Sequence, residues 1–414
     1  MKCCAWIVSV VAGVLVCGCA DLQQQANSEQ AQQRWGRVRA RVKLQLAERA
    51  FEHAVLDEAF DHCREVVALD PDLPEAYLLM TRIQLERGEL AGADSVLGYA
   101  ETLAPASPDV AYLRGVISER RGQHTEAGDH FRRAYEAQPG DLDFLLAYAE
   151  SLLAADQSQE ALELLQARCL DFEQDAAIHT LIGQAFSFLG RHDEAAGSLL
   201  LATQLAPQDA LLREQAGLAL LTAGRTNEAS LLLEPMLDDA TASVSPGLIV
   251  AWAGALLDKD NAAEAIRVLR RGLDRHEADA LLWTLYAKAH LITGELDTAG
   301  YAASKAVALA PDLAEAGLLL AYHALVTGRS DDAVLAIQSL LKKNPDDIEA
   351  RLLYAHALEG QTGGQSQAVE QYRRVLALVP DHAFARARLD QLVPEPVLQS
   401  SPSPEAAPEP ESPN

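Results

Sequence analysis

The sequence predicts an all-α protein, a solenoid of about ten helix-turn-helix units closed by a C-terminal capping helix. Three periodic features of the 414 residues lead to this prediction. An Ala recurs ten times at spacings of 34 to 36 residues, a Gly stands five residues before seven of these alanines, and a Pro stands twelve residues after seven of them. The recurring alanines are Ala59, Ala93, Ala127, Ala161, Ala195, Ala229, Ala265, Ala299, Ala333 and Ala368.

Each feature of the unit has a physical reason. Small residues twelve positions before the Ala, such as Gly183 and Gly217, allow two antiparallel helices to approach closely, and the residue four after the Ala lies on the same helical face. The Gly is expected to end the first helix in a left-handed conformation, and the Pro to end the second. Aspartates that follow the prolines are expected to cap the next first helix; they are Asp72, Asp109, Asp141, Asp209 and Asp312.

The pattern resembles the tetratricopeptide repeat, over about residues 40 to 380. Ile182-Gly183-x2-Phe186 with Ala195 and Pro207, and Trp283-x2-Tyr286-Ala287 with Ala299 and Pro311, match its marks well. The resemblance implies a right-handed superhelix whose first helices line a concave surface. Residues 381–393 are interpreted as the capping helix, with Arg386, Arg388 and Gln391 on its solvated face.

Composition excludes some partners. Lys and Arg number 34 and Asp and Glu 60, a net charge of −26, which argues against nucleic acid as a partner because phosphate binding needs clustered cations. Of the six cysteines, four lie in the first 19 residues, so the remaining Cys63 and Cys169 form no disulfide framework.

The N-terminus predicts export. An apolar run over residues 5–16 has the length of a signal peptide core, and Val16-Cys17-Gly18-Cys19 resembles the lipobox of bacterial lipoproteins, although Cys17 stands where Ala or Ser is commoner. The resemblance implies a signal peptide over 1–18, lipidation of Cys19, a membrane anchor and, from Ala20, the outer membrane with the protein facing the periplasm. An uncleaved membrane anchor or plain signal cleavage are the alternatives.

Residues 19–33 are polar and Gln-rich and are expected to be a tether. Five cations follow within residues 34–43, for which two interpretations stand. They form either a contact with anionic lipid head groups or the solvated face of the first helix, with Trp35, Val38, Val42 and Leu46 turned inward. The second interpretation is favoured.

The predicted domains follow from these features and from one break. Pro235 falls inside a second helix and two residues are added before the seventh unit, so repeats one to six are assigned to 34–242 and repeats seven to ten with the cap to 243–393. The tail, 394–414, is rich in Pro, Glu and Ser and is predicted to be disordered.

No motif for catalysis or for a cofactor occurs in the sequence. There is no Gly-Lys dipeptide, no G-x-G-x-x-G and no H-E-x-x-H, and no C-x-x-C occurs beyond the signal segment. Cys63 with His53 and His62 suggests a metal site only superficially, since Cys63 occupies an inward position. We therefore predict no enzyme activity, no cofactor and no metal.

Function is expected on the concave surface. The residues predicted to bind a partner there are Glu214, Leu218, Leu221, Leu257, Lys288, Leu291, Tyr322 and Leu325. The same apolar side chains could instead pack between repeats. Two functions are compatible with the sequence: a lipid-anchored scaffold that binds protein or peptide partners in an envelope assembly of the pilus, secretion or polysaccharide export type, and a structural or self-assembling spacer without a specific ligand. The oligomeric state is not predicted.

Overall fold

The fold is described by a computed structural model over residues 32, 34–239 and 244–393. The predicted signal peptide, the Cys19 predicted to be lipidated, all of the predicted tether except residue 32, and the tail lie outside these residues. Every regular element of the described residues is helical, with no strand, and none of these helices is long and apolar enough to span a bilayer. The predicted all-α solenoid is thus confirmed.

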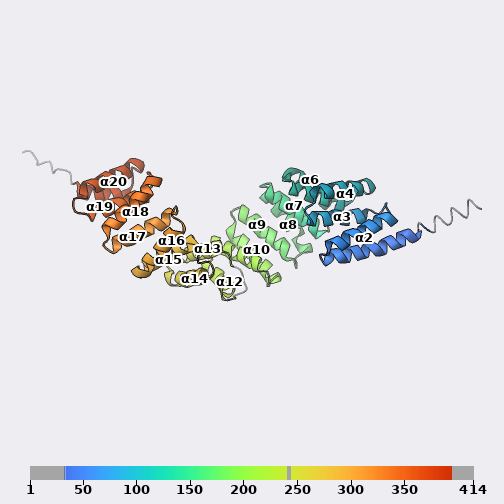
Figure 1. Ribbon diagram of the computed structural model, residues 1–414, viewed down its shortest axis with the longest axis horizontal. Coiled ribbons are helices and arrows are strands. Elements are labelled where there is room, and N and C mark those ends of the chain that lie inside the picture. The colour runs from blue at the N-terminus through green and yellow to red at the C-terminus, as the bar shows by residue number, and fades with distance from the viewer. Residues whose placement is uncertain (1–31, 33, 240–243, 394–414) are drawn as a thin grey trace, which may run out of the picture. The chain divides into compact units, whose positions relative to one another are not determined.

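The chain forms two compact halves, one ending at Pro207 and one beginning at Gln208. In the N-terminal half, a first helix over residues 34–52 begins repeat one. The helices that follow are α2 (Leu56–Leu69), α3 (Pro74–Glu86), α4 (Leu90–Leu103), α5 (Pro108–Arg120), α6 (His124–Ala137), α7 (Leu142–Ala154), α8 (Ser158–Arg168), a 3-10 turn (Cys169–Asp171), α9 (Ala176–Phe188) and α10 (His192–Leu205) (Figure 1).

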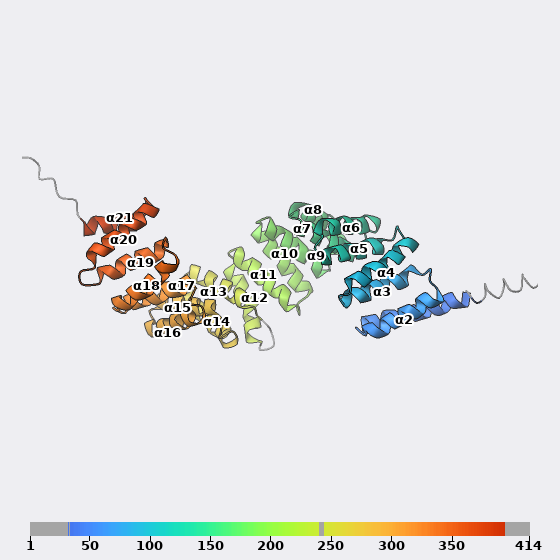
Figure 2. The same ribbon diagram turned by 45° about the horizontal axis from the view of Figure 1, so that its top comes forward.

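The C-terminal half contains repeats six to ten and the cap. Its helices are α11 (Ala210–Thr222), α12 (Thr226–Asp238), α13 (Pro246–Asp258), α14 (Ala262–Arg275), α15 (Ala280–Thr293), α16 (Leu296–Leu309), α17 (Ala314–Val326), α18 (Ser330–Lys343), α19 (Ile348–Glu359), α20 (Gln365–Leu378) and α21 (Ala383–Leu392) (Figure 2). Within each half, each helix packs chiefly on its neighbours along the chain, as expected of stacked helical pairs.

A left-handed residue separates the two helices of every repeat. All seven predicted glycines have positive φ, between 71° and 83°. The three repeats without Gly place Ala54, Asp156 and Asp260 in the same conformation, with φ of 57° to 62°, five residues before Ala59, Ala161 and Ala265. All ten repeats therefore share a left-handed residue at this position, which the sequence signal marks in seven of them. In repeat ten the connection is longer, with five residues between α19 and α20.

The small residue of the first helix faces the apolar residue of the second. A Cβ placed on Gly115, Gly183 or Gly217 would lie only 2.5–2.6 Å from the Phe131, Leu199 or Leu233 side chain, respectively. These partners stand four residues after the recurring Ala, so the two sequence positions contact each other directly. The predicted close approach of the helices is confirmed.

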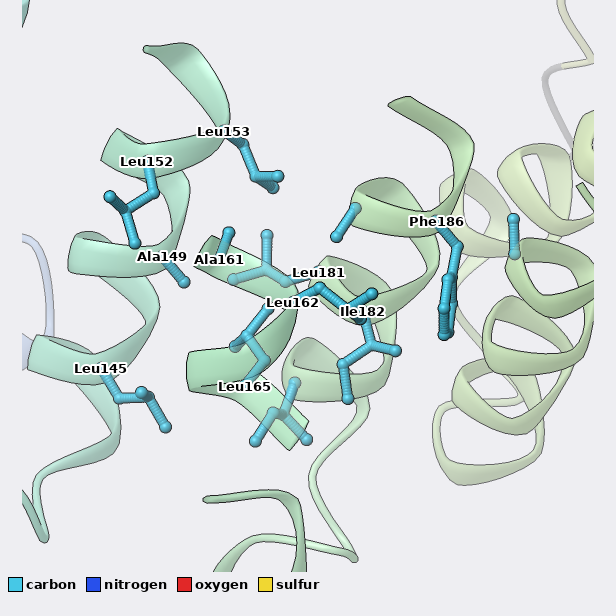
Figure 3. Packing of buried hydrophobic residues seen from close by; sticks show 13 residues of the cluster. Leu145, Ala149, Leu152, Leu153, Ala161, Leu162, Leu165, Leu181, Ile182 and Phe186 are labelled. Carbon is cyan, nitrogen blue, oxygen red and sulfur yellow. The ribbon is translucent and has the colours of Figure 1, made fainter. Parts of the chain in front are cut away.

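Side chains of three consecutive helices form the core of repeats four and five. Leu162 and Leu165 of α8 lie between Ala149 of α7 and Ile182 of α9 (Figure 3). All four are buried, with at most 6% of the surface exposed. Each second helix therefore packs on the next first helix as well as on its own partner.

The ends of the helices follow the predictions in part. Second helices end two residues before the recurring Pro, for example at Leu69 before Pro71. Asp141 and Asp209 accept backbone N–H bonds as N-caps, as predicted. The prediction is wrong for the other three aspartates. Asp72 and Asp312 lie one residue before the N-caps, Leu73 and Leu313. Asp109 lies inside the first turn of α5, which begins at Pro108.

The first helix corrects a second prediction. Its inward face is formed by Ala40, Leu44, Ala47 and Ala50, which are buried in the core of repeats one and two. The four residues predicted to turn inward are instead exposed: Trp35 (69%), Val38 (56%), Val42 (56%) and Leu46 (39%). The helix is apolar on two sides, and only the side with the small residues meets α2 and the next repeat.

Pro235 lies inside α12, as predicted, and the helix continues to Asp238. On both sides of residues 240–243 the backbone is held by other helices. Arg275 of α14 donates to the carbonyl oxygens of Leu237 and Asp239 at 2.9 and 2.8 Å, and a ring nitrogen of His276 lies 2.9 Å from the carbonyl oxygen of Val244. The division of the chain at 242/243 stays a prediction.

The cap helix α21 is attached by a half-buried carboxylate. Glu359, at the end of α19, accepts a hydrogen bond from the Tyr372 hydroxyl at 2.6 Å and is ion-paired with Arg388. Burial favours a raised pKa for Glu359, but the hydrogen bonds from Arg388 and Tyr372 outweigh it and lower that pKa below its usual value. Arg388, predicted on the solvated face, is therefore a structural contact of the cap.

Candidate functional site: an apolar pocket on the first helices

The first helices of successive repeats lie side by side in the C-terminal half. α11 contacts α13, α13 contacts α15, α15 contacts α17, and α17 contacts α19. One continuous surface is thus formed by the helices that carry the predicted binding residues. Side chains at equivalent positions of these helices form rows, because the repeats share one register.

A pocket of about 430 Å³ opens on this surface over repeats eight to ten. Its lining is mostly apolar, with charged groups and one His among its residues. The residues that line it are Lys288 of α15, Glu315, Leu318, Leu319 and Tyr322 of α17, Glu349, Leu352, Leu353 and His356 of α19, and Phe384 of the cap.

The pocket is built twice from the same pattern. Glu315, Leu318, Leu319 and Tyr322 follow one another at i, i+3, i+4 and i+7, which places them on one face of α17. The equivalent four positions of α19, one 34-residue period later, carry Glu349, Leu352, Leu353 and His356. Two parallel apolar rows, each with a carboxylate at its N-terminal end, form the floor.

The charged groups are available to a partner. Among the described residues, Glu315, Glu349 and Lys288 make no ion pair and no side-chain hydrogen bond. Tyr322 and Phe384 are about half exposed, at 49% and 52%. Such a surface can bury an apolar helix face and pair with a cation near the carboxylates and an anion near Lys288.

Much of the chain matches models of one protein family. Models described as tetratricopeptide repeat match residues 78–141, 120–185, 176–209, 250–314 and 318–383, together more than half of the chain. The chain belongs to the tetratricopeptide repeat family. Repeat proteins of this family serve as scaffolds for protein–protein interaction, and they are generally not enzymes.

Solved structures similar to this tetratricopeptide repeat protein share little sequence with it. The APC/C heterotetramer Cut9–Hcn1 has 11% identity and a TM-score of 0.41, with 84% of this chain and 95% of that chain covered. A tetratricopeptide repeat protein from Parabacteroides merdae has 15% identity, a TM-score of 0.41, and coverages of 69% and 98%. MamA from Desulfovibrio magneticus has 18% identity, a TM-score of 0.37, and coverages of 40% and 93%. None of the curated proteins matches the chain.

The tetratricopeptide repeat structure places the eight predicted binding residues in different environments. Lys288 and Tyr322 line the pocket. Leu218 is 49% exposed on α11, whereas Leu291 and Leu325 are half-buried on α15 and α17. Whether any of them binds a partner stays a prediction.

Three of the predicted residues have structural contacts. Leu221 and Leu257 are buried, with 9% and 7% of their surfaces exposed, because the last turn of a first helix is covered by its neighbours. Glu214 accepts a hydrogen bond from the backbone N–H of Ser245 at 2.8 Å and so fixes the start of α13. We therefore exclude these three side chains from the candidate site.

Most of the pocket residues were not predicted from the sequence. Glu315, Leu319, Glu349, Leu352, Leu353, His356 and Phe384 were not among the predicted binding residues. A usable signal was present, because stepping 34 residues from Tyr322 leads to His356 and from Glu315 to Glu349. Phe384 had a comparable signal, because it follows Glu349 by 35 residues, the spacing that also separates Ala333 from Ala368.

The two cysteines that the structure describes, Cys63 and Cys169, have no reactive environment. Cys63 is fully buried, and burial raises the pKa of its thiol to about 12, as expected of core filling. Cys169 lies in the 3-10 turn after α8, and both thiols are free. Within the part of the chain that the structure describes, no three His, Cys, Asp or Glu side chains are grouped as a metal site would require.

Proposed function

We propose that this protein is a lipid-anchored scaffold of the bacterial cell envelope that binds a helix of a protein partner in the pocket of repeats eight to ten. The observation that carries the proposal is the pocket itself, in which the two equivalent rows of α17 and α19 meet Phe384 of the cap. Its apolar floor provides affinity for an apolar helix face, and its unpaired charges provide orientation.

The partner's chemistry follows from the charged groups. Glu315 and Glu349 stand at the N-terminal ends of the neighbouring first helices α17 and α19, and Lys288 lies on the preceding first helix, α15. An amphipathic helix with Leu or Phe on one face, a Lys or Arg near the two carboxylates and an Asp or Glu near Lys288 is complementary to this arrangement. An assembly of the pilus, secretion or polysaccharide export type is the setting that we propose for such a partner.

The test of binding uses residues whose side chains are exposed in the free protein. Changing Tyr322→Ser and Phe384→Ser together should weaken capture of the partner by about thirtyfold or more, since apolar anchors at the centre of an interface contribute about 2 kcal/mol or more. Partners are first identified by cross-linking in native membranes, and affinity is then measured with the purified partner. A matched control changes Leu231→Ser and Leu335→Ser, which are 74% and 67% exposed on second helices.

The binding scaffold and the structural spacer, the two functions predicted from the sequence, give different results in this capture experiment. A binding scaffold loses capture in the pocket variant while its melting temperature stays within a few degrees of the control. A spacer without a specific ligand yields no partner that depends on Tyr322 and Phe384. Equal capture by the pocket variant and the control variant would therefore remove the pocket from the proposal.

The anchor is tested separately. Lipidation at Cys19 is supported by the lipobox-like sequence, and it places the protein at a membrane, by the sequence rule the outer membrane on its periplasmic side. The mature protein should have the mass of an acylated chain beginning at Cys19 and should sediment with outer membranes. Cys19→Ala should release the protein or leave it unprocessed, and unchanged mass and fractionation would contradict the anchor.

A further inference from the structure

We infer that the first helix, residues 34–52, docks on an anionic lipid surface through an exposed apolar stripe. This surface is distinct from the pocket, and its contact with lipid does not require an acyl chain on Cys19. The stripe consists of Trp35, Val38, Val42 and Leu46, which follow one another at helical spacing and are 39–69% exposed. The helix is drawn in blue beside α2 (Figure 1).

The position of Val42 is exposed on the first helix but buried on the next four first helices. Stepping 34 residues at a time from Val42 leads to Ala76, Val110, Phe144 and Ile178, all of which are buried against other helices. Trp35 and Val38 lie farther toward the N-terminus than the equivalent starts of α3 and α5, Pro74 and Pro108. The first helix thus extends beyond the repeat pattern, and the extension carries the largest exposed apolar side chain of the stripe.

Six cations accompany the stripe, and four of them have no ion-pair partner among the described residues. The helix carries six Lys and Arg against two Glu, in a chain whose net charge is −26. Lys43 pairs with Glu65 at 2.6 Å and Arg37 approaches Asp70 at 3.9 Å. The other four make no ion pair or side-chain hydrogen bond among the described residues; they are Arg34, Arg39, Arg41 and Arg49.

The charges argue against another helical repeat as the occupant. Arg49 lies at the position that Ile83 and Ile117 occupy in the next two repeats, where both side chains are fully buried. A repeat stacked on the first helix would have to bury the Arg49 guanidinium, which is costly without a partner. A lipid surface can accept the same residue, because its head groups remain hydrated and carry negative charge.

The composition of the helix fits an interfacial segment. Such helices combine Trp and aliphatic residues on one face with Lys and Arg around it, and they lie about 5–10 Å deep at the boundary of head groups and acyl chains. The segment between Cys19 and the helix, residues 20–33, would span at most about 50 Å when fully extended. An anchored chain therefore brings the helix within reach of the bilayer.

Trp35 provides the measurement. The mature full-length protein is reconstituted in phosphatidylcholine vesicles with or without 30% phosphatidylglycerol, in which a brominated lipid quenches nearby indoles, and the signal of the Trp35→Phe protein is subtracted. We expect quenching of Trp35 in the anionic vesicles only, and its loss in 1 M salt, where screening acts over about 3 Å. Trp252 is fully buried and serves as an internal reference.

The charged side chains are tested by a triple variant. Changing Arg39, Arg41 and Arg49 to Gln should lower the ratio of docked to undocked helix roughly 100-fold, since each cation near an anionic surface contributes about fivefold. The control changes three exposed arginines elsewhere to Gln; they are Arg133, Arg270 and Arg373. Circular dichroism melting of both variants establishes that the fold is intact.

The outcomes are separable from those of the proposed function. Mass spectrometry reports acylation, and if the mature chain carries no lipid, co-sedimentation with the same vesicles replaces quenching. Absence of Trp35-dependent signal in anionic vesicles overturns the inference, as does equal quenching in neutral vesicles. Concentration-dependent dimers that Val42→Glu abolishes would assign the stripe to a second copy instead of lipid and would likewise overturn it.

Discussion

Gly183 illustrates how strictly one position of a repeat is determined. A Cβ there would lie 2.6 Å from Cγ of Leu199 and 3.3 Å from the carbonyl oxygen of Ala195. The clash thus involves the branch point of a packed side chain and the backbone, and not the flexible end of a side chain. Gly183→Ala should lower the free energy of unfolding by about 1–3 kcal/mol through overpacking. The measurement is urea denaturation followed by circular dichroism.

A matched substitution in the same repeat isolates the cause. Gly197 lies in α10, and a Cβ at that position would meet nothing within 4 Å. Gly197→Ala should therefore raise the free energy of unfolding by about 0.5–1 kcal/mol, because Ala loses less conformational entropy in a helix. If both substitutions shift the midpoint in the same direction, close packing at Gly183 is not the determining factor.

At the scale of the element, the cap depends on one carboxylate that must be ionised. The pKa of Glu359 is lowered in the folded protein because the bonds from Arg388 and Tyr372 outweigh burial, so the stabilisation is complete above the ordinary pKa near 4.5 and is lost as the pH falls below it. Glu359→Gln should cost about 1–3 kcal/mol at pH 7. The difference from the wild type should shrink as the pH is lowered toward 3.

The control for the cap is an exposed ion pair on the neighbouring helix. Glu370 pairs with Arg374 at 3.0 Å, and both side chains are about half exposed. Glu370→Gln should change stability by less than about 1 kcal/mol at any pH. A Glu359→Gln deficit that stays constant between pH 7 and pH 3 would show that shape, and not charge, attaches α21.

The helices themselves were predictable because the Ala recurs in all ten repeats, with the Gly and the Pro each present in seven of them. Most of the left-handed turns, the contacts of the small residues and the helix ends follow from this spacing. The first residues of the helices were predicted less accurately. α3 begins at Pro74, two residues after the predicted cap Asp72, and α5 begins at Pro108, one residue before the predicted cap Asp109. The first helix was assigned the wrong buried face because both of its faces are apolar, and sequence alone does not say which one has a neighbour.

The pocket was predictable only in part for a related reason. Register identifies which residues share a row, but burial depends on how closely adjacent helices approach. Leu221 and Leu257 occupy groove-like positions and are nevertheless covered, while Tyr322 remains half exposed. Phe384 reaches the pocket from the cap helix, which continues the register of the first helices, since Ala350 and Ala385 are equivalent and both fully buried.

For the molecule as a whole, the segment 235–247 remains the predicted weak point of the stack. Within the C-terminal half, α12 and α13 pack least closely of all consecutive helices, and α14 holds the backbone at both sides of the segment through Arg275 and His276. Limited digestion with subtilisin should therefore cut first in 235–247 or in the tail after 393. Mass spectrometry of the early fragments locates the cuts.

A variant sharpens this experiment. Arg275→Gln removes the donor to the carbonyl oxygens of Leu237 and Asp239, so cleavage in 235–247 should become several times faster while cleavage in the tail does not change. Arg270→Gln, on the exposed side of α14, should leave both rates unaltered. Early cuts distributed evenly over the other turns would instead support a stack of uniform stability.

The ten left-handed turns have a consequence for how this chain can change in length. Because each turn has a left-handed residue and recurs at nearly the same interval, a stretch from one turn to the next, such as residues 122–155, is a complete module with matching ends. Gain or loss of such a module leaves every neighbouring helix in phase. Within either half, duplication can therefore lengthen the stack by whole repeats without redesigning the helices on either side of the new one.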